Sequence, residues 1–286
     1  MYLHPRKELL GLSLLLLFSN SVAFGAPRLV RAFIFGSRDL ACYSLTDPET
    51  RYTVVLQGSP DDLAYDPGRG WGYEVLYPPG GDLPYGSREG YGIFGPFDAS
   101  PNNRNIYTPD DCPEEIFDSF IGAKTFATPC NESVTGDRNK PCEPPEGIIF
   151  RVDVPNGRYR FVAAVGSPDN NHAHRIVAED GGSGPPENIG DNYVVLVNNF
   201  DQAEYGAGVF AWVGFQPFVA PELQGPSFVH IDRDGNPTNG PPDCPVLEVT
   251  QGYIRIHQLQ GNSNDGAAGR GDPNGGDLVL LEIWKV

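Results

Sequence analysis

The sequence predicts an all-β fold, a jelly-roll β-sandwich with long loop insertions, and three observations lead to this expectation. The chain of 286 residues contains 35 Gly and 28 Pro, so residues that break helices occur throughout. Short runs of apolar or alternating residues recur along its second half, with turn residues between them. Hydrophobic residues make up 40% of the chain, which is enough for a large core and argues against disorder.

The N-terminus has the pattern of a secretory signal peptide. Arg6 and Lys7 precede an apolar run, residues 9–18, and small residues follow up to Gly25. We expect cleavage after Gly25, so that residues 1–25 are the signal peptide and 26–286 form a single mature domain. The run is too short to cross a bilayer and no later segment suffices, so we expect no transmembrane segment. The expected location is secreted or extracellular, with the periplasm as the alternative.

Nine runs of residues are predicted to be strands. They are 29–35, 148–154, 158–166, 175–179, 193–198, 209–215, 246–250, 253–259 and 278–284. Residues 57–147 carry many Gly, Pro and aromatic residues and are expected to form a loop-rich insertion, either a lid over the sandwich or a lobe of its own. Two connections, Pro155-Asn156-Gly157 and Thr250-Gln251-Gly252, are predicted to be β-hairpin turns.

Charge and cysteine content narrow the class of protein. The net charge is −17 and the basic residues form no cluster, which excludes a nucleic-acid binder. The five cysteines lack the C-x-x-C spacing of zinc or redox sites. For an exported chain we therefore expect one or two disulfides, with Cys112, Cys130 and Cys142 as the best candidates, and one thiol left free or buried.

Several short motifs follow one another in a familiar order. They are Phe33-Ile34-Phe35-Gly36, Gly70-Trp71-Gly72-Tyr73, Val154 to Arg160, the Leu-Glu-Val-Thr-x-Gly of 247–252 and a terminal Leu281-Glu282-Ile283. This order resembles the galactose-binding-like β-sandwich modules, in particular malectin-like domains and the N-terminal sandwich of rhamnogalacturonan acetylesterases. The resemblance implies paired terminal strands, a sugar bound by loops at one edge or face, and structural calcium. The chain lacks the Gly-Asp-Ser nucleophile motif of those esterases, so catalysis by that route is not expected.

Aromatic residues in the loop-rich region are candidates for stacking on sugar rings. Trp71 and Tyr73 are the best of them, and Asp66, Arg69 and Glu74 lie close by in the sequence to bind hydroxyl groups. The alternative interpretation is that long loops use such aromatic residues to build small cores of their own.

Oxygen ligands suggest a metal site in one loop. Asp232, Asp234 and Asn236 alternate, and Asp243 occupies the twelfth position counted from Asp232, an order that resembles a calcium loop. The prolines that follow exclude an EF-hand helix, and an Asx-rich turn is the alternative. His172-Ala173-His174 could form a metal pair on an extended segment, but we interpret these histidines as solvated loop residues.

These observations leave three hypotheses for function. The first is a secreted, non-catalytic protein that binds extracellular polysaccharide through loop aromatics, with calcium as a candidate structural cofactor. The second is a structural or adhesive protein of the cell surface or matrix that self-associates in response to calcium. The third is a polysaccharide-modifying enzyme, although the chain carries no Ser-His-Asp elbow, Walker loop or H-E-x-x-H motif.

Overall fold

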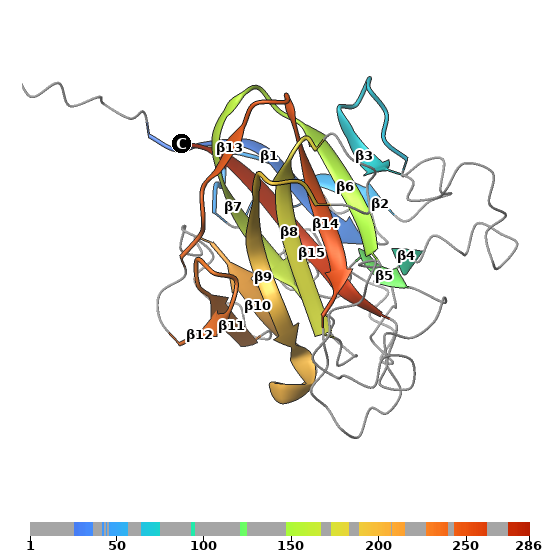
Figure 1. Ribbon diagram of the computed structural model, residues 1–286, viewed down its shortest axis with the longest axis vertical. Helices are drawn as coiled ribbons and strands as arrows, with labels where there is room; N and C mark the ends of the chain where they lie inside the picture. The colour runs from blue at the N-terminus through green and yellow to red at the C-terminus, as the bar shows by residue number, and fades with distance from the viewer. Residues whose placement is uncertain are drawn as a thin grey trace, which may run out of the picture.

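The fold is a two-layer β-sandwich (Figure 1), which confirms the predicted all-β class. The computed structural model describes residues 26–36, 42, 44, 46–56, 64–74, 93–94, 121–124, 147–166, 173–182, 189–206, 208–214, 227–239, 243–261 and 274–286. These residues form strands, turns and a short 3-10 helix at Gln202–Glu204. No helix in this part of the chain is long and apolar enough to cross a membrane.

The larger sheet has the strand order β12-β11-β10-β7-β15-β1-β2, with β13 beside β7 and with β5 joining β4 to β15. Its members are β1 (Arg28–Gly36), β2 (Thr53–Leu56), β4 (Ile93–Phe94), β5 (Ile121–Lys124), β7 (Gly157–Val165), β10 (Val209–Val213), β11 (Ser227–Ile231), β12 (Pro237–Thr238), β13 (Leu247–Val249) and β15 (Asn274–Lys285). The first and last strands, β1 and β15, pair antiparallel, as the resemblance implied. Because β15 also pairs with β7, the end of the chain lies in the middle of this sheet.

The smaller sheet has the order β3-β6-β14-β8-β9. Its strands are β3 (Trp71–Glu74), β6 (Gly147–Asp153), β8 (Ala173–Asp180), β9 (Tyr193–Asp201) and β14 (Tyr253–Gln260). Its strands lie in front of the larger sheet in Figure 1. The strand β3, together with β4 and β5, lies within the region 57–147 that the sequence analysis expected to be loops.

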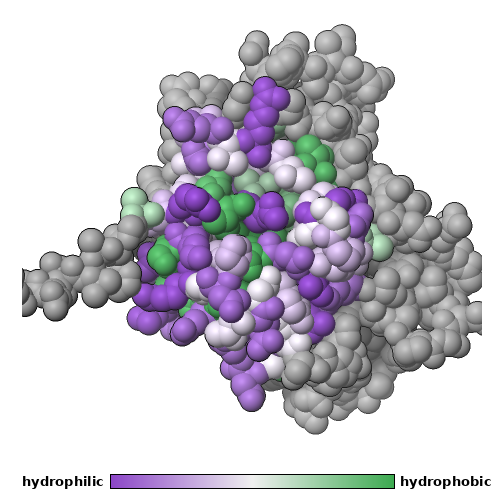
Figure 2. All heavy atoms as spheres, turned by 90° about the horizontal axis from the view of Figure 1, so that it is seen from above, coloured by the Kyte–Doolittle hydropathy of each residue, from purple (hydrophilic) through white to green (hydrophobic). Residues whose placement is uncertain are grey.

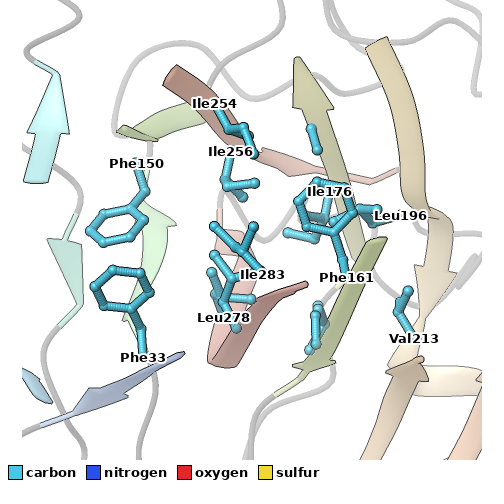
Figure 3. Close-up of a cluster of buried hydrophobic side chains, with 14 of the residues drawn as sticks. Phe33, Phe150, Phe161, Ile176, Leu196, Val213, Ile254, Ile256, Leu278 and Ile283 are labelled. Atoms are coloured by element: carbon cyan, nitrogen blue, oxygen red, sulfur yellow. The ribbon is translucent and has the colours of Figure 1, made fainter. Parts of the chain in front are cut away.

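The core fills the space between the two sheets (Figure 3). Alternate residues of each strand point inward, so β-branched and aromatic side chains from both sheets meet. At one end of the core the Phe150 ring from the smaller sheet packs against Phe33 and Phe35 of the larger sheet, with both pairs of ring centroids 5.1 Å apart in edge-to-face geometry. This packing fixes the distance between the layers.

The two predicted hairpins are wrong, because both connections cross from one sheet to the other. The turn at residues 155–157 leads from β6 in the smaller sheet to β7 in the larger one, and residues 250–252 lead from β13 back to β14. The two arches lie side by side, since the Val154 amide donates to the Gly252 carbonyl at 3.0 Å. Asp180 holds the second arch by accepting hydrogen bonds from the amides of Thr250 and Gln251, at 2.9 and 3.0 Å. The strands on each side of these turns pack through their side chains rather than through backbone hydrogen bonds.

Several predictions lie outside the described residues. These are the signal peptide, most of the 57–147 insertion and the candidate disulfide cysteines Cys112, Cys130 and Cys142, and all of them stay predictions. Cys244, in contrast, is a free and buried thiol. Burial raises the pKa of this thiol to about 12, and its sulfur accepts a hydrogen bond from the Phe161 amide.

A buried carboxylate, Glu282, holds a covering segment against the outer face of the larger sheet. The covering segment comprises the described residues of 42–52, and Glu282 accepts hydrogen bonds from Ser44 at 2.6 Å, from Tyr52 at 2.7 Å and from Thr46. The Trp284 indole donates a fourth hydrogen bond at 3.1 Å. Glu282 has no exposed surface, and its cross-strand neighbours Ala32 and Val162 belong to a second hydrophobic cluster. The larger sheet is therefore covered on both faces in this region.

We expect Glu282→Gln to lower the free energy of unfolding by about 1–3 kcal/mol, because an amide cannot accept all four hydrogen bonds and leaves buried donors unpaired. Denaturant unfolding followed by tryptophan fluorescence measures this change. Glu49→Gln is the control, since this substitution makes the same change of charge at an exposed position of the covering segment. Equal stability of the two variants would contradict the role given to Glu282.

Candidate functional site

The tight turn before β3 positions the predicted binding residues. The Asp66 carbonyl accepts the amides of Arg69 and Gly70, and its side chain accepts the Gly68 amide at 2.6 Å. Asp and Gly favour this geometry, because the carboxylate caps the turn and Gly70 adopts a φ of +71°. The Gly70 carbonyl then accepts the amide of Asp153 at 2.7 Å, which ties the turn to strand β6.

The two aromatic residues chosen from the sequence point inward. Tyr73 is 5% exposed, and its hydroxyl accepts a hydrogen bond from Gln258 at 3.1 Å, so its ring belongs to the core. Trp71 is partly buried and packs against Phe33, with ring centroids 5.7 Å apart. The Arg69 guanidinium lies over the Trp71 ring at 4.4 Å from its centroid. In this structure Tyr73 therefore presents no stacking face to a ligand, and Trp71 presents its ring to Arg69.

The outer side of the smaller sheet carries polar residues from β3, β6 and β14, together with Tyr65 just before the turn. We call the set Tyr65, Glu74, Arg151, Asp153, Tyr253 and Arg255 the polar face. Strand register explains it, since Gly72 and Arg255 both pair with Arg151, and Tyr253 pairs with Asp153. Residues that alternate with the core residues Phe150, Val152, Ile254 and Ile256 point out of the sandwich.

Arg151 lies at the centre of the polar face, between two tyrosine rings. Its guanidinium carbon is 4.1 Å from the ring centroid of Tyr65 and 3.8 Å from that of Tyr253. Guanidinium groups stack well on aromatic faces, because they are planar and weakly hydrated. Burial alone lowers the pKa of Arg151, but its interactions with Asp153, Tyr65 and Glu74 together outweigh this effect and raise the pKa. The cation is therefore permanent.

Carboxylates neutralise the arginines of the polar face. Arg151 contacts Asp153 through Nε at 3.0 Å and Glu74 through Nη1 at 3.3 Å. The second oxygen of Glu74 lies 2.6 Å from Nε of Arg255. Tyr65 donates its hydroxyl to the second oxygen of Asp153 at 2.6 Å, and burial together with this hydrogen bond raises the pKa of Tyr65. Charges of both signs thus alternate across the face.

Next to the polar face lies a buried pair, Glu179 and His257. The carboxylate oxygen and the imidazole Nε2 are 2.8 Å apart, and the Gly190 amide also donates to Glu179. Burial raises the pKa of the Glu179 carboxyl, but the hydrogen bonds from His257 and Gly190 outweigh burial and leave its pKa below the ordinary value. Both side chains are almost completely buried, at 1% and 2% exposure. Glu179 pairs with Arg255 across β8 and β14, so this buried pair lies on the same side of the smaller sheet as the polar face.

The end of the sandwich beside the polar face has a mixed surface. Figure 2 looks onto the end where the two arches and the turn before β3 lie, and it shows strongly hydrophilic residues with hydrophobic residues between them. Amphipathic surfaces of this kind suit ligands that carry both hydroxyl groups and C–H faces.

The loop proposed for calcium folds as an Asx turn. One oxygen of Asp232 accepts the amides of Asp234 and Asn236, both at 2.9 Å, and the Asn236 side chain accepts a hydrogen bond from Asn198 at 3.1 Å. Asp234 and Asp243 are exposed. Within the described part of the chain, no three His, Cys, Asp or Glu side chains gather as a metal site. Calcium at these residues stays a prediction.

The interpretation of His174 as a solvated loop residue is wrong, because it is fully buried in β8. Its ring stacks on Phe200, and its Nδ1 accepts the Asp277 amide at 3.2 Å. The other ring nitrogen, which then carries the proton of the neutral tautomer, lies 3.3 Å from the Gln202 side-chain oxygen. His174 therefore belongs to a buried hydrogen-bond network and not to a loop.

Sequence reasoning found part of the polar face and missed the rest. It named Glu74, it named Asp66 and Arg69 in the adjoining turn, and it counted Tyr65 among the aromatic residues of the loop-rich region, but it did not name Arg151, Asp153, Tyr253 or Arg255. A signal was available in the alternation of Arg151-x-Asp153 and Tyr253-x-Arg255, which predicts one polar face on each strand. The pairing of these distant strands was not available from the sequence.

Comparisons with known proteins give no family for this chain. No family model matches it, and no curated protein matches it. A search of solved structures finds the X-ray crystal structure of protein YxiM from Bacillus subtilis, with 14% identity and a TM-score of 0.39. The match covers 90% of this chain and 40% of that chain, so the chain spans less than half the length of YxiM. The likeness is too low to carry an argument about function.

We expect Gly72→Ala to destabilise the site. Gly72 has a φ of +145°, and a Cβ there would lie 2.5 Å from the Tyr65 backbone, so the segment before the turn would have to move away from β3. Thermal unfolding should show a lower Tm, while Gly206→Ala is the matched control, because its φ of +102° is also positive but nothing lies within 4 Å of the added methyl group. A smaller loss in Gly72→Ala than in the control would contradict the close approach.

The lowered pKa of the Glu179 carboxyl predicts that the contribution of this residue to stability depends on pH. Its folded-state pKa lies below the ordinary 4.5, so its ionised form contributes stability that is complete above the unfolded-state pKa and is lost as the pH falls through the folded-state value. We therefore expect the Tm difference between the native protein and Glu179→Gln to be constant near neutral pH and to shrink below about pH 4. A difference that persists unchanged into stronger acid would contradict this assignment.

Proposed function

We propose that this chain is a secreted, non-catalytic carbohydrate-binding protein and that the polar face of the smaller sheet is its binding site. The observation that carries the proposal is Arg151, clamped between Tyr65 and Tyr253 with Glu74 and Asp153 on its donors. These contacts support the interpretation of the polar face as a rigid, partly exposed surface of planar and polar groups. Export rests on the signal-peptide pattern of residues 1–25.

Sugar recognition needs the features that this face combines. Pyranose rings offer C–H patches that pack on aromatic surfaces and hydroxyl groups that both donate and accept hydrogen bonds. Tyr65 and Tyr253 are half-buried, and the side chains of Arg151 and Asp153 are 24% and 34% exposed. Because the stack and the ion pairs hold these side chains in place, a ligand would order few groups on binding.

The carboxylates of the face support binding rather than hydrolysis. Both oxygens of Glu74 contact arginines, and the oxygens of Asp153 contact Arg151 and Tyr65. Glycoside hydrolysis requires one carboxyl that donates a proton and a second that attacks or activates water. Carboxylates held by permanent cations are poorly suited to donate a proton.

Substitution of Arg151 tests the proposal. Arg151→Ala should weaken binding of the purified protein to its oligosaccharide by about tenfold or more, because it removes the stacked cation and leaves both carboxylates without it. Arg151→Lys should also bind more weakly, since an ammonium lacks the planar fork. Isothermal titration against an oligosaccharide panel measures the affinities.

The control is Arg51→Ala, at an exposed position of the covering segment on the larger sheet. Near-ultraviolet circular dichroism establishes that each variant is folded. Sugar binding that persists unchanged in folded Arg151→Ala and Arg151→Lys would place the site elsewhere, and absence of binding across the panel would contradict the proposed function.

A further inference from the structure

We infer that the polar face selects a neutral saccharide, without carboxylate or sulfate groups, and binds it without calcium. The inference rests on the proposed function and names the chemical class of its ligand. It follows from the way the charges of the face are matched to one another.

The cations of the polar face already have carboxylate partners. Arg151 directs Nε to Asp153 and Nη1 to Glu74, and Nε of Arg255 lies 2.6 Å from the other oxygen of Glu74. A uronate or sulfate would have to compete with these carboxylates for the same guanidinium groups. The competing anion would also come to lie beside Glu74 and Asp153, and like charges so close cost free energy. An acidic sugar therefore meets no unmatched positive charge among these residues.

The carboxylate oxygens of the polar face are occupied in ways that disfavour calcium. Calcium in sugar sites needs carboxylate oxygens, and it binds them in sets of several. Here the oxygens of Glu74 are both within 3.3 Å of arginine nitrogens, and Asp153 shares its two oxygens between Arg151 and the Tyr65 hydroxyl. A dication at this place would have to displace two guanidinium groups. The polar face is therefore unsuited to bridge an acidic sugar through calcium.

A neutral, hydroxyl-rich ligand fits the matched charges of the polar face. A hydroxyl group both donates and accepts, so it can join a network of matched ion pairs without disturbing the balance of charge. The net charge of −17 for the whole chain adds a general repulsion of polyanions at low salt. A polyhydroxylated, uncharged ring is the ligand that fits both the matched charges of the polar face and the negative net charge of the whole chain.

Matched oligosaccharides test this inference. Oligosaccharides of glucose and of galactose are each compared with the corresponding uronate, which differs only in the group at C6. Binding is measured by isothermal titration at low and high salt, and with calcium or with EDTA. We expect the neutral member of a pair to bind at least about tenfold more tightly, with little effect of salt or EDTA. Tighter binding of the uronate, or loss of binding in EDTA, would overturn the inference while leaving carbohydrate binding intact. If no member of either series binds, the proposed function fails and the inference with it.

Glu74→Gln tests the charge matching directly. The amide removes the negative charge that Arg151 and Arg255 share, so the net charge of the face rises by one and its preference should shift toward the uronate by about tenfold. Glu49→Gln makes the same change of charge on the covering segment of the other sheet and should leave the preference unchanged. If Glu74→Gln does not fold, Asp153→Asn frees Arg151 in the same way. An unchanged preference in a folded variant would overturn the argument.

Discussion

The position of β15 in the middle of the larger sheet is the constraint on which the rest of the structure depends. This strand pairs with β1 on one side and β7 on the other, so it joins the first and the middle part of the chain. Its inward residues Leu281 and Ile283 belong to the core, while Glu282 on the outer side holds the covering segment. The larger sheet therefore cannot be completed until the twelve residues of β15 have paired with both neighbours. Contacts of such long range are typical of slow-folding β-proteins.

The two arches connect the larger sheet to the smaller sheet. Because β6 leads into β7, and β13 into β14, each arch connects a strand of one layer to a strand of the other. The hydrogen bond between Val154 and Gly252 aligns the two arches, and it thereby sets β6 beside β14 at the level of Asp153 and Tyr253. The central ion pairs of the polar face form between these two strands and their neighbour β3. The residues of the candidate site therefore come together because the chain crosses from one sheet to the other at these two arches.

The polar face combines rigidity with balanced charge. A stacked arginine and shared carboxylates hold one another in place, and the buried pair of Glu179 and His257 supports β8 and β14 beside them. Such a surface gains little from attracting ions, since each charge already has a partner. Its capacity for recognition lies in shape, ring surface and hydrogen bonding, and these are the interactions by which uncharged sugars are distinguished.

The sequence alone determined the all-β class and most long strands, because alternation and turn residues are local properties. It also placed Glu74, with Asp66 and Arg69 in the adjoining turn, at a candidate site. It misjudged Pro155-Asn156-Gly157, since a turn sequence specifies a change of direction and not the sheet to which the next strand belongs. Tyr73 was named as a ligand residue but faces the core, and His174 was named as a loop residue but is buried, because burial depends on which strands stack. Only the tertiary structure brought Arg151 between Tyr65 and Tyr253, for these residues are far apart in the chain and meet through strand pairing, which no local pattern records.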